Sequence, residues 1–182
     1  GSLWIVCNGE IFNYIELRQD LEKRGHRFST ECDIEVLVHL YEDYGDQLFR
    51  MLNGQFALVL WDRKHRKMLL ARDHVGICPL YYHSGPETFV FASELKSLFQ
   101  WPDIPVEWNY PALVQTLTFW SPIPGHSMFK NIYEIKPGHY LQLTPDHIEE
   151  KSYWDVPFTD DPDKLIRDPR RAREQTRELL QD

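Results

Sequence analysis

The sequence predicts an α/β fold in which short strands alternate with helices, and three stretches carry this prediction. Over residues 3–25 a run of apolar residues comes first, a glycine follows it, and a helical pattern comes last. Residues 55–61 and 67–72 are apolar strand patterns joined by a polar segment. Residues 133–135 and 139–143 are strand patterns that flank Pro137-Gly138. The larger part of the chain is therefore expected to form one mixed domain.

The first stretch is where the chemistry is expected. Residues 3–6 are large and partly β-branched, which predicts a buried strand, and Asn8-Gly9 is a turn signal that would end it. Asn13 can then cap a helix, with Gly25 as its C′ residue. A strand, a glycine turn and a helix often present backbone N–H groups to a negative oxygen, which suggests an oxyanion site. A plain structural turn at Asn8-Gly9 is the alternative.

A second helix is expected over residues 34–44, where apolar residues share a broad face and Gly45 follows. Thr30 and Asp33 match a capping box with Asp in place of Glu, which is a structural explanation of Asp33. After the strand at residues 67–72, Gly76 and Pro79 bend the chain. An Arg72–Asp73 pair at such a bend is expected to be a structural brace rather than a catalyst.

The remaining elements are shorter. Strands are expected at residues 80–82 and 88–92, a short helix capped by Ser93, and a helix at residues 110–119. The strands around Pro137-Gly138 are expected to form a hairpin that Tyr153-Trp154 completes. Residues 160–163 resemble an acidic linker, and the charged stretch after Pro169 predicts a marginal, solvated helix. These features divide the chain into a domain at residues 1–157 and a linker region at 158–182.

Composition limits the function classes. The 182 residues are 42% apolar with a net charge of −8, which argues against nucleic acid and acidic membrane surfaces as partners. The cysteines Cys7, Cys32 and Cys78 have neither metal-ligand nor disulfide-framework spacing, as is typical of reduced cytosolic proteins. No apolar run approaches the roughly 20 residues that span a bilayer. We expect a cytoplasmic protein without metal that acts on a small molecule or a protein.

Three ordered motifs, N-G-E-I-F-N, T-E-C-D-I-E-V and R-D-H-V-G-I-C-P-L-Y, resemble the class II glutamine amidotransferase domain of glutamine-hydrolysing asparagine synthetases. The similarity runs from about residue 3 to about residue 155 and includes F-K-N-I-Y-E-I-K-P-G-H-Y and Y-W-D. It implies an αββα sandwich of mainly antiparallel sheets, as in N-terminal-nucleophile hydrolases, without its first strands. It also implies these roles: an oxyanion hole at Asn8 and Gly9, contacts to the amino end of L-glutamine at Glu10 and Asp33, and a pocket wall around Arg72, Asp73, Gly76 and Pro79.

The chain departs from the family at its start. The family nucleophile is an amino-terminal cysteine whose α-amino group is the base, whereas this chain begins Gly1-Ser2 and lacks the upstream arginine. We therefore expect a piece truncated at both ends that hydrolyses no glutamine alone. Cys7 lies inside a strand and is expected to face a layer rather than replace the nucleophile.

The absent parts determine the expected cofactors and partners. The resemblance implies that residues 158–182 hold the linker and the start of a C-terminal synthetase domain. It places ATP and Mg²⁺ in the absent part of that domain, so no cofactor is expected here. An uncovered sheet edge would favour a homodimer or strand exchange. Two alternatives remain: a noncatalytic domain of an ammonia-using or β-lactam-synthetase-like enzyme, and a protein-interaction module using the 14% aromatic residues. The acceptor that the parent enzyme amidates is not determined by these residues.

Overall fold

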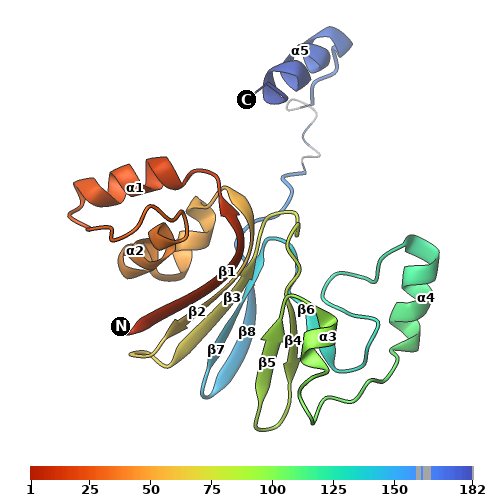
Figure 1. Cartoon of the computed structure of the whole chain (residues 1–182). Helices are drawn as coiled ribbons and strands as arrows, with labels where there is room; N and C mark the ends of the chain where they lie inside the picture. Colours follow the sequence, from red (N-terminus) through yellow and green to blue (C-terminus); the bar gives the residue numbers. More distant parts are fainter. Residues whose placement is uncertain (159–160, 162–164, 182) are drawn as a thin grey trace.

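The computed structural model describes residues 1–158, 161 and 165–181 and contains two antiparallel sheets with helices packed on them (Figure 1). The larger sheet has the strand order β1-β2-β3-β7-β8, and the smaller has the order β5-β4-β6. This confirms the predicted α/β class and the mainly antiparallel sheets. The strands are β1 (Leu3–Ile11), β2 (Gly54–Asp62), β3 (Lys67–Arg72), β4 (Tyr81–Ser84), β5 (Phe89–Ala92), β6 (Ile132–Glu134), β7 (His139–Thr144) and β8 (His147–Ser152).

The α-helices agree closely with the sequence patterns, whereas the sequence did not predict the 3₁₀ helix. They are α1 (Tyr14–Lys23), α2 (Glu35–Tyr44), the 3₁₀ helix η1 (Gly45–Met51), α3 (Leu95–Leu98), α4 (Tyr110–Phe119) and α5 (Pro169–Leu179). Asn13 is the N-cap residue of α1 as predicted, but its side chain makes no hydrogen bond to the helix. It donates to the carbonyl of Met51 and accepts from the N–H of Asn53. The short helix α3 begins after Glu94, without the predicted side-chain cap from Ser93.

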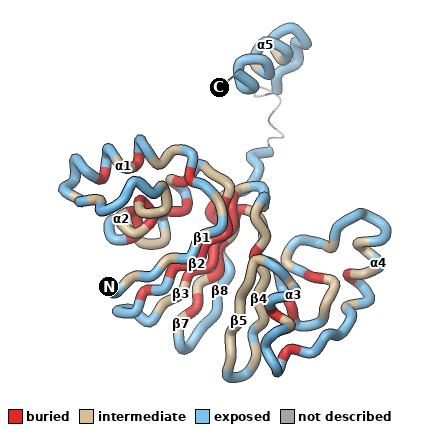
Figure 2. Tube along the Cα trace, viewed as in Figure 1, coloured by how far each residue is buried: buried red, intermediate tan, exposed pale blue. Residues whose placement is uncertain are grey.

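The layers follow from the burial of each strand face. Helices α1, α2 and η1 cover one face of the larger sheet, where Leu37, Phe49 and Phe56 are fully buried. The smaller sheet covers the opposite face through Leu80 and Ile135, and α3 packs on the outside of the smaller sheet. The order is therefore helix, sheet, sheet, helix, as the resemblance implied. Figure 2 shows the buried residues concentrated along the inner strands.

Strand β1 is the terminal strand of its sheet, and its two faces differ. Leu3, Ile5 and Cys7 pack on the helical core, whereas the side chains of Trp4 and Val6 are 63% and 67% exposed. The strand therefore carries apolar side chains on its outer face and backbone groups along an unpaired side of the sheet.

The predicted turn at Asn8-Gly9 is wrong, because β1 continues through both residues to Ile11. Gly9 lies opposite Phe56 on β2 and has a φ of +140°. A Cβ at this position would lie 2.0 Å from the carbonyl oxygen of Gln55. The glycine therefore serves a close approach between two strands and not a reversal of the chain.

The predicted hairpin around Pro137-Gly138 is also wrong. Strand β6 pairs with β4 in the smaller sheet, whereas β7 pairs with β3 and β8 in the larger one. Gly138, with a φ of +67°, turns the chain from one sheet to the other, and its N–H donates to the carbonyl of Asp73 (2.9 Å). The hairpin partner of β7 is β8, which precedes Tyr153.

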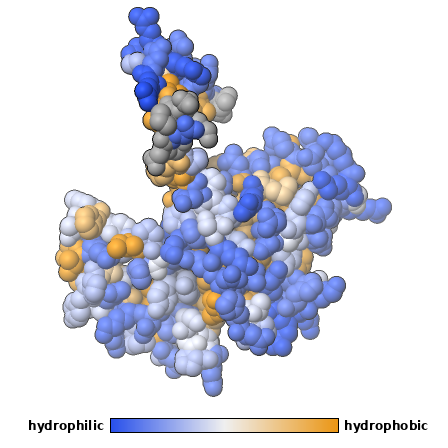
Figure 3. All heavy atoms as spheres, turned by 180° about the vertical axis from the view of Figure 1, so that it is seen from behind, coloured by the Kyte–Doolittle hydropathy of each residue, from blue (hydrophilic) through white to orange (hydrophobic). Residues whose placement is uncertain are grey.

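The C-terminal helix α5 is largely polar. Helix α5 contains no buried residue and is capped by Asp168, whose carboxylate accepts from the N–H of Arg170. Of the predicted acidic linker at residues 160–163, only Asp161 lies within the described residues. Seen from behind, the surface is mostly hydrophilic with small separate hydrophobic patches (Figure 3). Within the described residues, no helix combines the length and apolar character needed to cross a bilayer.

Two buried charged residues at the end of β3 hold the loop over residues 73–79. Asp73 is 1% exposed, and its carboxylate accepts hydrogen bonds from the backbone N–H groups of Phe56 (3.2 Å), Val75 (3.1 Å), Gly76 (2.7 Å), Ile77 (3.0 Å) and Cys78 (3.2 Å). A carboxylate so bonded needs no cationic partner to be satisfied.

Arg72 joins the same loop to the smaller sheet. Its guanidinium donates to the carbonyls of Gly76 (2.6 Å) and Cys78 (2.8 Å) and to that of Ile135 (3.0 Å). Its ion-pair partner in the described residues is Glu134 (2.8 Å) and not Asp73. Burial raises the pKa of Glu134, and the Arg72 charge offsets part of that rise. The predicted Arg72–Asp73 pair is therefore wrong: Arg72 pairs with Glu134, and the side chains of Arg72 and Asp73 each bind the backbone around the bend.

The bend itself requires a glycine at residue 76. Gly76 has a φ of +72°, and a Cβ there would lie 2.8 Å from Pro137 and 2.9 Å from the Arg72 guanidinium carbon. Pro79 follows and leads the chain into the smaller sheet. Gly76 and Pro79 therefore bend the chain here, and the implied pocket wall around Arg72, Asp73, Gly76 and Pro79 stays a prediction.

We predict that Asp73→Asn lowers the free energy of unfolding by roughly 2–4 kcal/mol, because the amide places an NH₂ group against buried N–H donors. Urea denaturation followed by circular dichroism measures this change. Asp146→Asn, in the exposed β7–β8 turn, is the matched control and should stay within about 0.5 kcal/mol. Equal effects of the two substitutions would contradict the bracing role.

Candidate functional site

The backbone of Gly9 faces the outer edge of β1. Phe56, its cross-strand neighbour, donates its N–H to the Asp73 carboxylate (3.2 Å) and accepts at its carbonyl from the Asp73 N–H (2.9 Å). Both polar groups of Phe56 therefore point toward β3. In an antiparallel ladder, bonded and non-bonded pairs alternate, so the Gly9–Phe56 pair is a non-bonded one. The N–H of Gly9 is consequently directed away from the sheet, toward solvent.

The next N–H on that edge has a partner. Ile11, two residues after Gly9, donates its N–H to Oδ2 of Asp33 (2.8 Å). Because N–H groups two residues apart point to the same side of a strand, this bond agrees with the direction inferred for Gly9. It also places the carboxylate of Asp33, which lies in the loop that precedes α2, at the edge of β1.

The predicted capping box at Thr30 and Asp33 is wrong. Glu35 instead accepts from the N–H groups of Ser29 (2.7 Å) and Thr30 (2.7 Å) and from the Thr30 hydroxyl (2.5 Å). Asp33 is drawn away because the Ile11 N–H is an otherwise unpaired strand-edge donor. Asp33 therefore connects the helical layer to β1, and Glu35 holds the loop that carries it.

A pocket of about 430 Å³ opens at this edge. It brings together Glu10 and Asp33, two of the residues predicted to bind substrate. Its lining consists of Glu10, Ile11, Phe12, Tyr14, Glu31, Cys32 and Asp33. Sequence reasoning missed Glu31, whose carboxylate pairs with Arg18 (3.2 Å), although Glu31 stands in the motif that carries Asp33. The carboxylates make this pocket suited to a cationic group.

Asn8 lies beside the pocket and not in its lining. It is exposed and, by the two-residue period of β1, shares a strand face with Glu10 and the exposed Val6. The four predicted residues therefore lie close together: Asn8, Gly9 and Glu10 are consecutive on β1, and Asp33 is bonded to the next residue, Ile11. A backbone N–H, a side-chain amide and carboxylates can together bind a zwitterion that bears an amide.

Cys7 faces the helical layer, as its position in the strand predicts. Burial, and to a lesser degree the nearby Asp33 charge, raises the pKa of its thiol to about 12. At neutral pH the side chain is therefore a thiol and not the thiolate that attacks a carbonyl. Cys32, in contrast, is exposed at the pocket.

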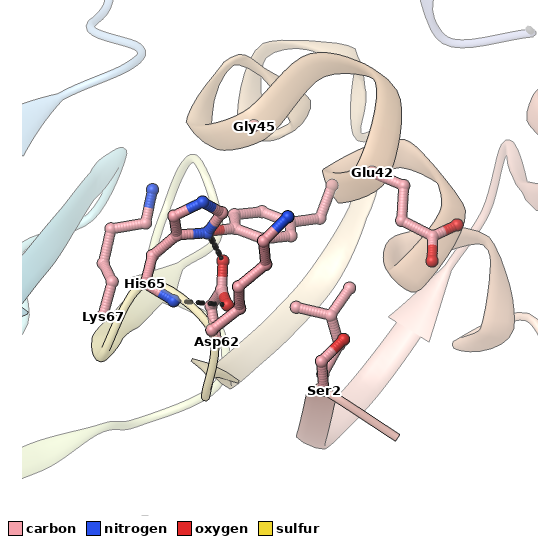
Figure 4. A pocket seen from close by; sticks show the side chains of 9 residues that line it. Ser2, Glu42, Gly45, Asp62, His65 and Lys67 are labelled. Atoms are coloured by element: carbon pink, nitrogen blue, oxygen red, sulfur yellow. Dashed lines mark hydrogen bonds and ion pairs between the residues drawn. The ribbon is translucent and has the colours of Figure 1, made fainter.

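A second pocket, of about 450 Å³, lies at the opposite end of β1 and β2 (Figure 4). Its polar centre is the buried Asp62, which accepts hydrogen bonds from the Tyr41 hydroxyl (3.0 Å) and from the backbone N–H (3.1 Å) and Nδ1 (2.6 Å) of His65. Burial acts to raise the pKa of Asp62, but these hydrogen bonds outweigh it, and the pKa is lowered. The arrangement joins α2 to the β2–β3 turn.

Comparison with known proteins gives a consistent result. The sequence model of the family described as "Glutamine amidotransferase domain" matches residues 1–154. Asparagine synthetase [glutamine-hydrolyzing] 3 of Bacillus subtilis is 37% identical over 84% of this chain and 25% of its own length. Amidase chry2 of Gibberella zeae is 33% identical over 97% of this chain and 25% of its own length. The chain thus spans about a quarter of these curated relatives.

A solved structure agrees with these matches. The glutamine phosphoribosylpyrophosphate (PRPP) amidotransferase of B. subtilis, complexed with ADP and GMP, superposes with a TM-score of 0.57 at 25% identity. The alignment covers 85% of this chain and 30% of that protein. The similarity therefore extends across both sheets.

We predict that the thiols react in an order set by burial. At pH 8 an excess of iodoacetamide should modify Cys32 first and leave Cys7 largely unmodified in the folded chain, because Cys7 is half-buried against the helical layer and its pKa is about 12. Peptide mass spectrometry over a time course measures the order, and the urea-unfolded chain, in which Cys7 and Cys32 should react alike, is the control. Rapid native-state alkylation of Cys7 would contradict its placement.

Proposed function

Because this chain belongs to the glutamine amidotransferase domain family, we propose that the edge of β1 binds L-glutamine in a glutamine-hydrolysing asparagine synthetase. The observation that supports this most is the direction of the Gly9 N–H, outward at the strand edge and two residues from the N–H that Asp33 accepts. Tetrahedral attack on an amide places negative charge on its oxygen, and an outward backbone N–H is suited to that charge.

The proposed roles follow from the chemistry of each group. The Gly9 N–H and the Asn8 side-chain amide are neutral donors for the developing oxyanion. Glu10 and Asp33 are carboxylates in one pocket and bind the α-ammonium group of glutamine. The Ile11 N–H holds Oδ2 of Asp33 in place before substrate arrives (2.8 Å), which reduces the ordering needed on binding.

We propose that the remaining steps of the reaction use parts of a longer protein, similar to the relatives, that lie outside this chain. Three relatives named asparagine synthetase [glutamine-hydrolyzing] are 36–37% identical to this chain and are covered over 22–28% of their lengths. We propose aspartate as the acceptor of the released ammonia, with ATP and Mg²⁺ used outside this chain. The cysteine nucleophile is likewise expected outside it, and a cytoplasmic location stays a prediction from cysteine usage.

We also propose that isolated copies of this chain associate through β1. The strand is terminal in its sheet and exposes Trp4 and Val6, a combination that favours pairing between chains.

We predict that Asn8→Ala lowers kcat for glutamate release from glutamine by roughly 10²–10³ in the full protein that carries this domain, because one oxyanion donor is lost. KM should change little, since the amino-end contacts remain. Asn53→Ala is the matched control: Asn53 is also exposed, and its hydrogen bonds are made by its backbone. Unchanged kcat in Asn8→Ala, or equal losses in both variants, would refute the oxyanion role.

We predict that the purified chain forms dimers or larger species that Val6→Lys disperses, because a lysine on an edge strand opposes strand pairing. Light scattering coupled to size-exclusion chromatography measures the mass. Val114→Lys, at a comparably exposed valine of α4, should leave the association unchanged. A monodisperse monomer of the unaltered chain at high concentration would contradict this proposal.

A further inference from the structure

Two histidines and a glutamate meet between the end of α1 and the middle of α2. Nδ1 of His26 lies 3.1 Å from Nδ1 of His39. Oε2 of Glu42 lies 3.2 Å from Nδ1 of His39 and 3.6 Å from Nδ1 of His26. The three ligand atoms thus form a nearly equilateral triangle. His39 and Glu42 are one helical turn apart on α2, and His26 follows Gly25 in the loop after α1.

The dimensions of this triangle are those of a transition-metal site. Zn²⁺ binds imidazole nitrogen at about 2.0–2.1 Å, so neighbouring ligands of a tetrahedral centre lie about 3.3–3.4 Å apart. The three observed separations, 3.1, 3.2 and 3.6 Å, bracket this value. Two imidazole nitrogens and one carboxylate oxygen favour Zn²⁺ and similar ions over Mg²⁺ or Ca²⁺, which prefer oxygen alone.

The outer ring nitrogens of both histidines face carboxylates. Nε2 of His26 lies 3.0 Å from Asp43, and Nε2 of His39 lies 3.9 Å from Glu35. The Nε2–H tautomer of His26 donates to Asp43 and leaves the Nδ1 lone pair directed at the cluster, where it can bind an ion. Carboxylates behind the histidines are also the usual support of protein zinc ligands, since they set the tautomer and ring orientation.

The surroundings hold the ligands in position. The side chains of His26 and His39 are 16% and 15% exposed, and Phe28 packs edge-on against His39 with ring centres 4.6 Å apart. Figure 4 shows the Glu42 carboxylate directed away from Asp62 and His65. Glu42 is 49% exposed, so the remaining corner of a tetrahedron is accessible to water.

We propose that His26, His39 and Glu42 form a binding site for a divalent transition metal of the Zn²⁺ class, with one position left for water. The bound ion links the loop after α1 to α2 and so steadies the layer that packs on β1. This site is separate from the glutamine pocket, and the proposal does not depend on the proposed function.

The test is a titration of the full chain, stripped of metal by a chelator and then dialysed, with Zn²⁺ and with Co²⁺ as a spectroscopic probe. We expect one equivalent to bind, a rise in the unfolding temperature with Zn²⁺, and visible absorption bands of four- or five-coordinate Co²⁺. His26→Gln and His39→Gln should each weaken Zn²⁺ binding by more than about 100-fold. His147→Gln, at an exposed histidine of β8, is the matched control and should bind like the unaltered chain.

A substitution that removes no ligand keeps the test valid even if the ligand variants fail to fold. Asp43→Asn keeps all three ligands and should weaken Zn²⁺ binding by about 10–100-fold, which is the usual effect of losing such a support. Circular dichroism of each metal-free variant checks the fold. No saturable binding by the unaltered chain, or equal binding by His147→Gln and both ligand variants, would overturn the proposal. Undiminished binding by folded Asp43→Asn would overturn the role of that carboxylate.

Discussion

The hydrogen bonds between Asp73 and the backbone of Phe56 are the constraint on which the candidate site depends. They use the N–H and the carbonyl of Phe56 on the side away from β1. Gly9, which lies opposite Phe56, is therefore left with its N–H at the outer edge. Because Asp73 is buried and bonded to several loop N–H groups, its position is fixed by the whole segment over residues 73–78. A structural brace thus decides the direction of a functional donor.

An exposed strand edge is usually a hazard, because its free N–H and carbonyl groups pair with other chains. In β1, two consecutive outward N–H groups are placed for other uses: that of Ile11 binds Asp33, and that of Gly9 faces solvent beside an acidic pocket. The close approach of Gly9 to the Gln55 carbonyl excludes any side chain there. Packing against β2 and access of a ligand to the N–H therefore both require that residue 9 has no side chain.

The loop between α1 and α2 contributes residues to three separate sets of polar contacts. His26 begins it, Ser29 and Thr30 are held by Glu35, and Asp33 ends it at the edge of β1. All of these contacts reach α2 or β1, so the loop has few independent ways to move. The position of the Asp33 carboxylate therefore depends on how α1 and α2 pack together as well as on its own bond to Ile11.

Elements with a strong local period, including α1, α4 and β3, could be predicted from the sequence. So could the inward direction of the Cys7 side chain and, through the ordered motifs, the family. Three features could be seen only in the folded chain: Asn8-Gly9 is part of a strand, Pro137-Gly138 connects the two sheets, and His26 lies against His39. Local patterns report each residue's own backbone preference and burial. The partner of a strand edge, a buried carboxylate or an imidazole comes from a distant part of the chain, and packing alone brings the two together.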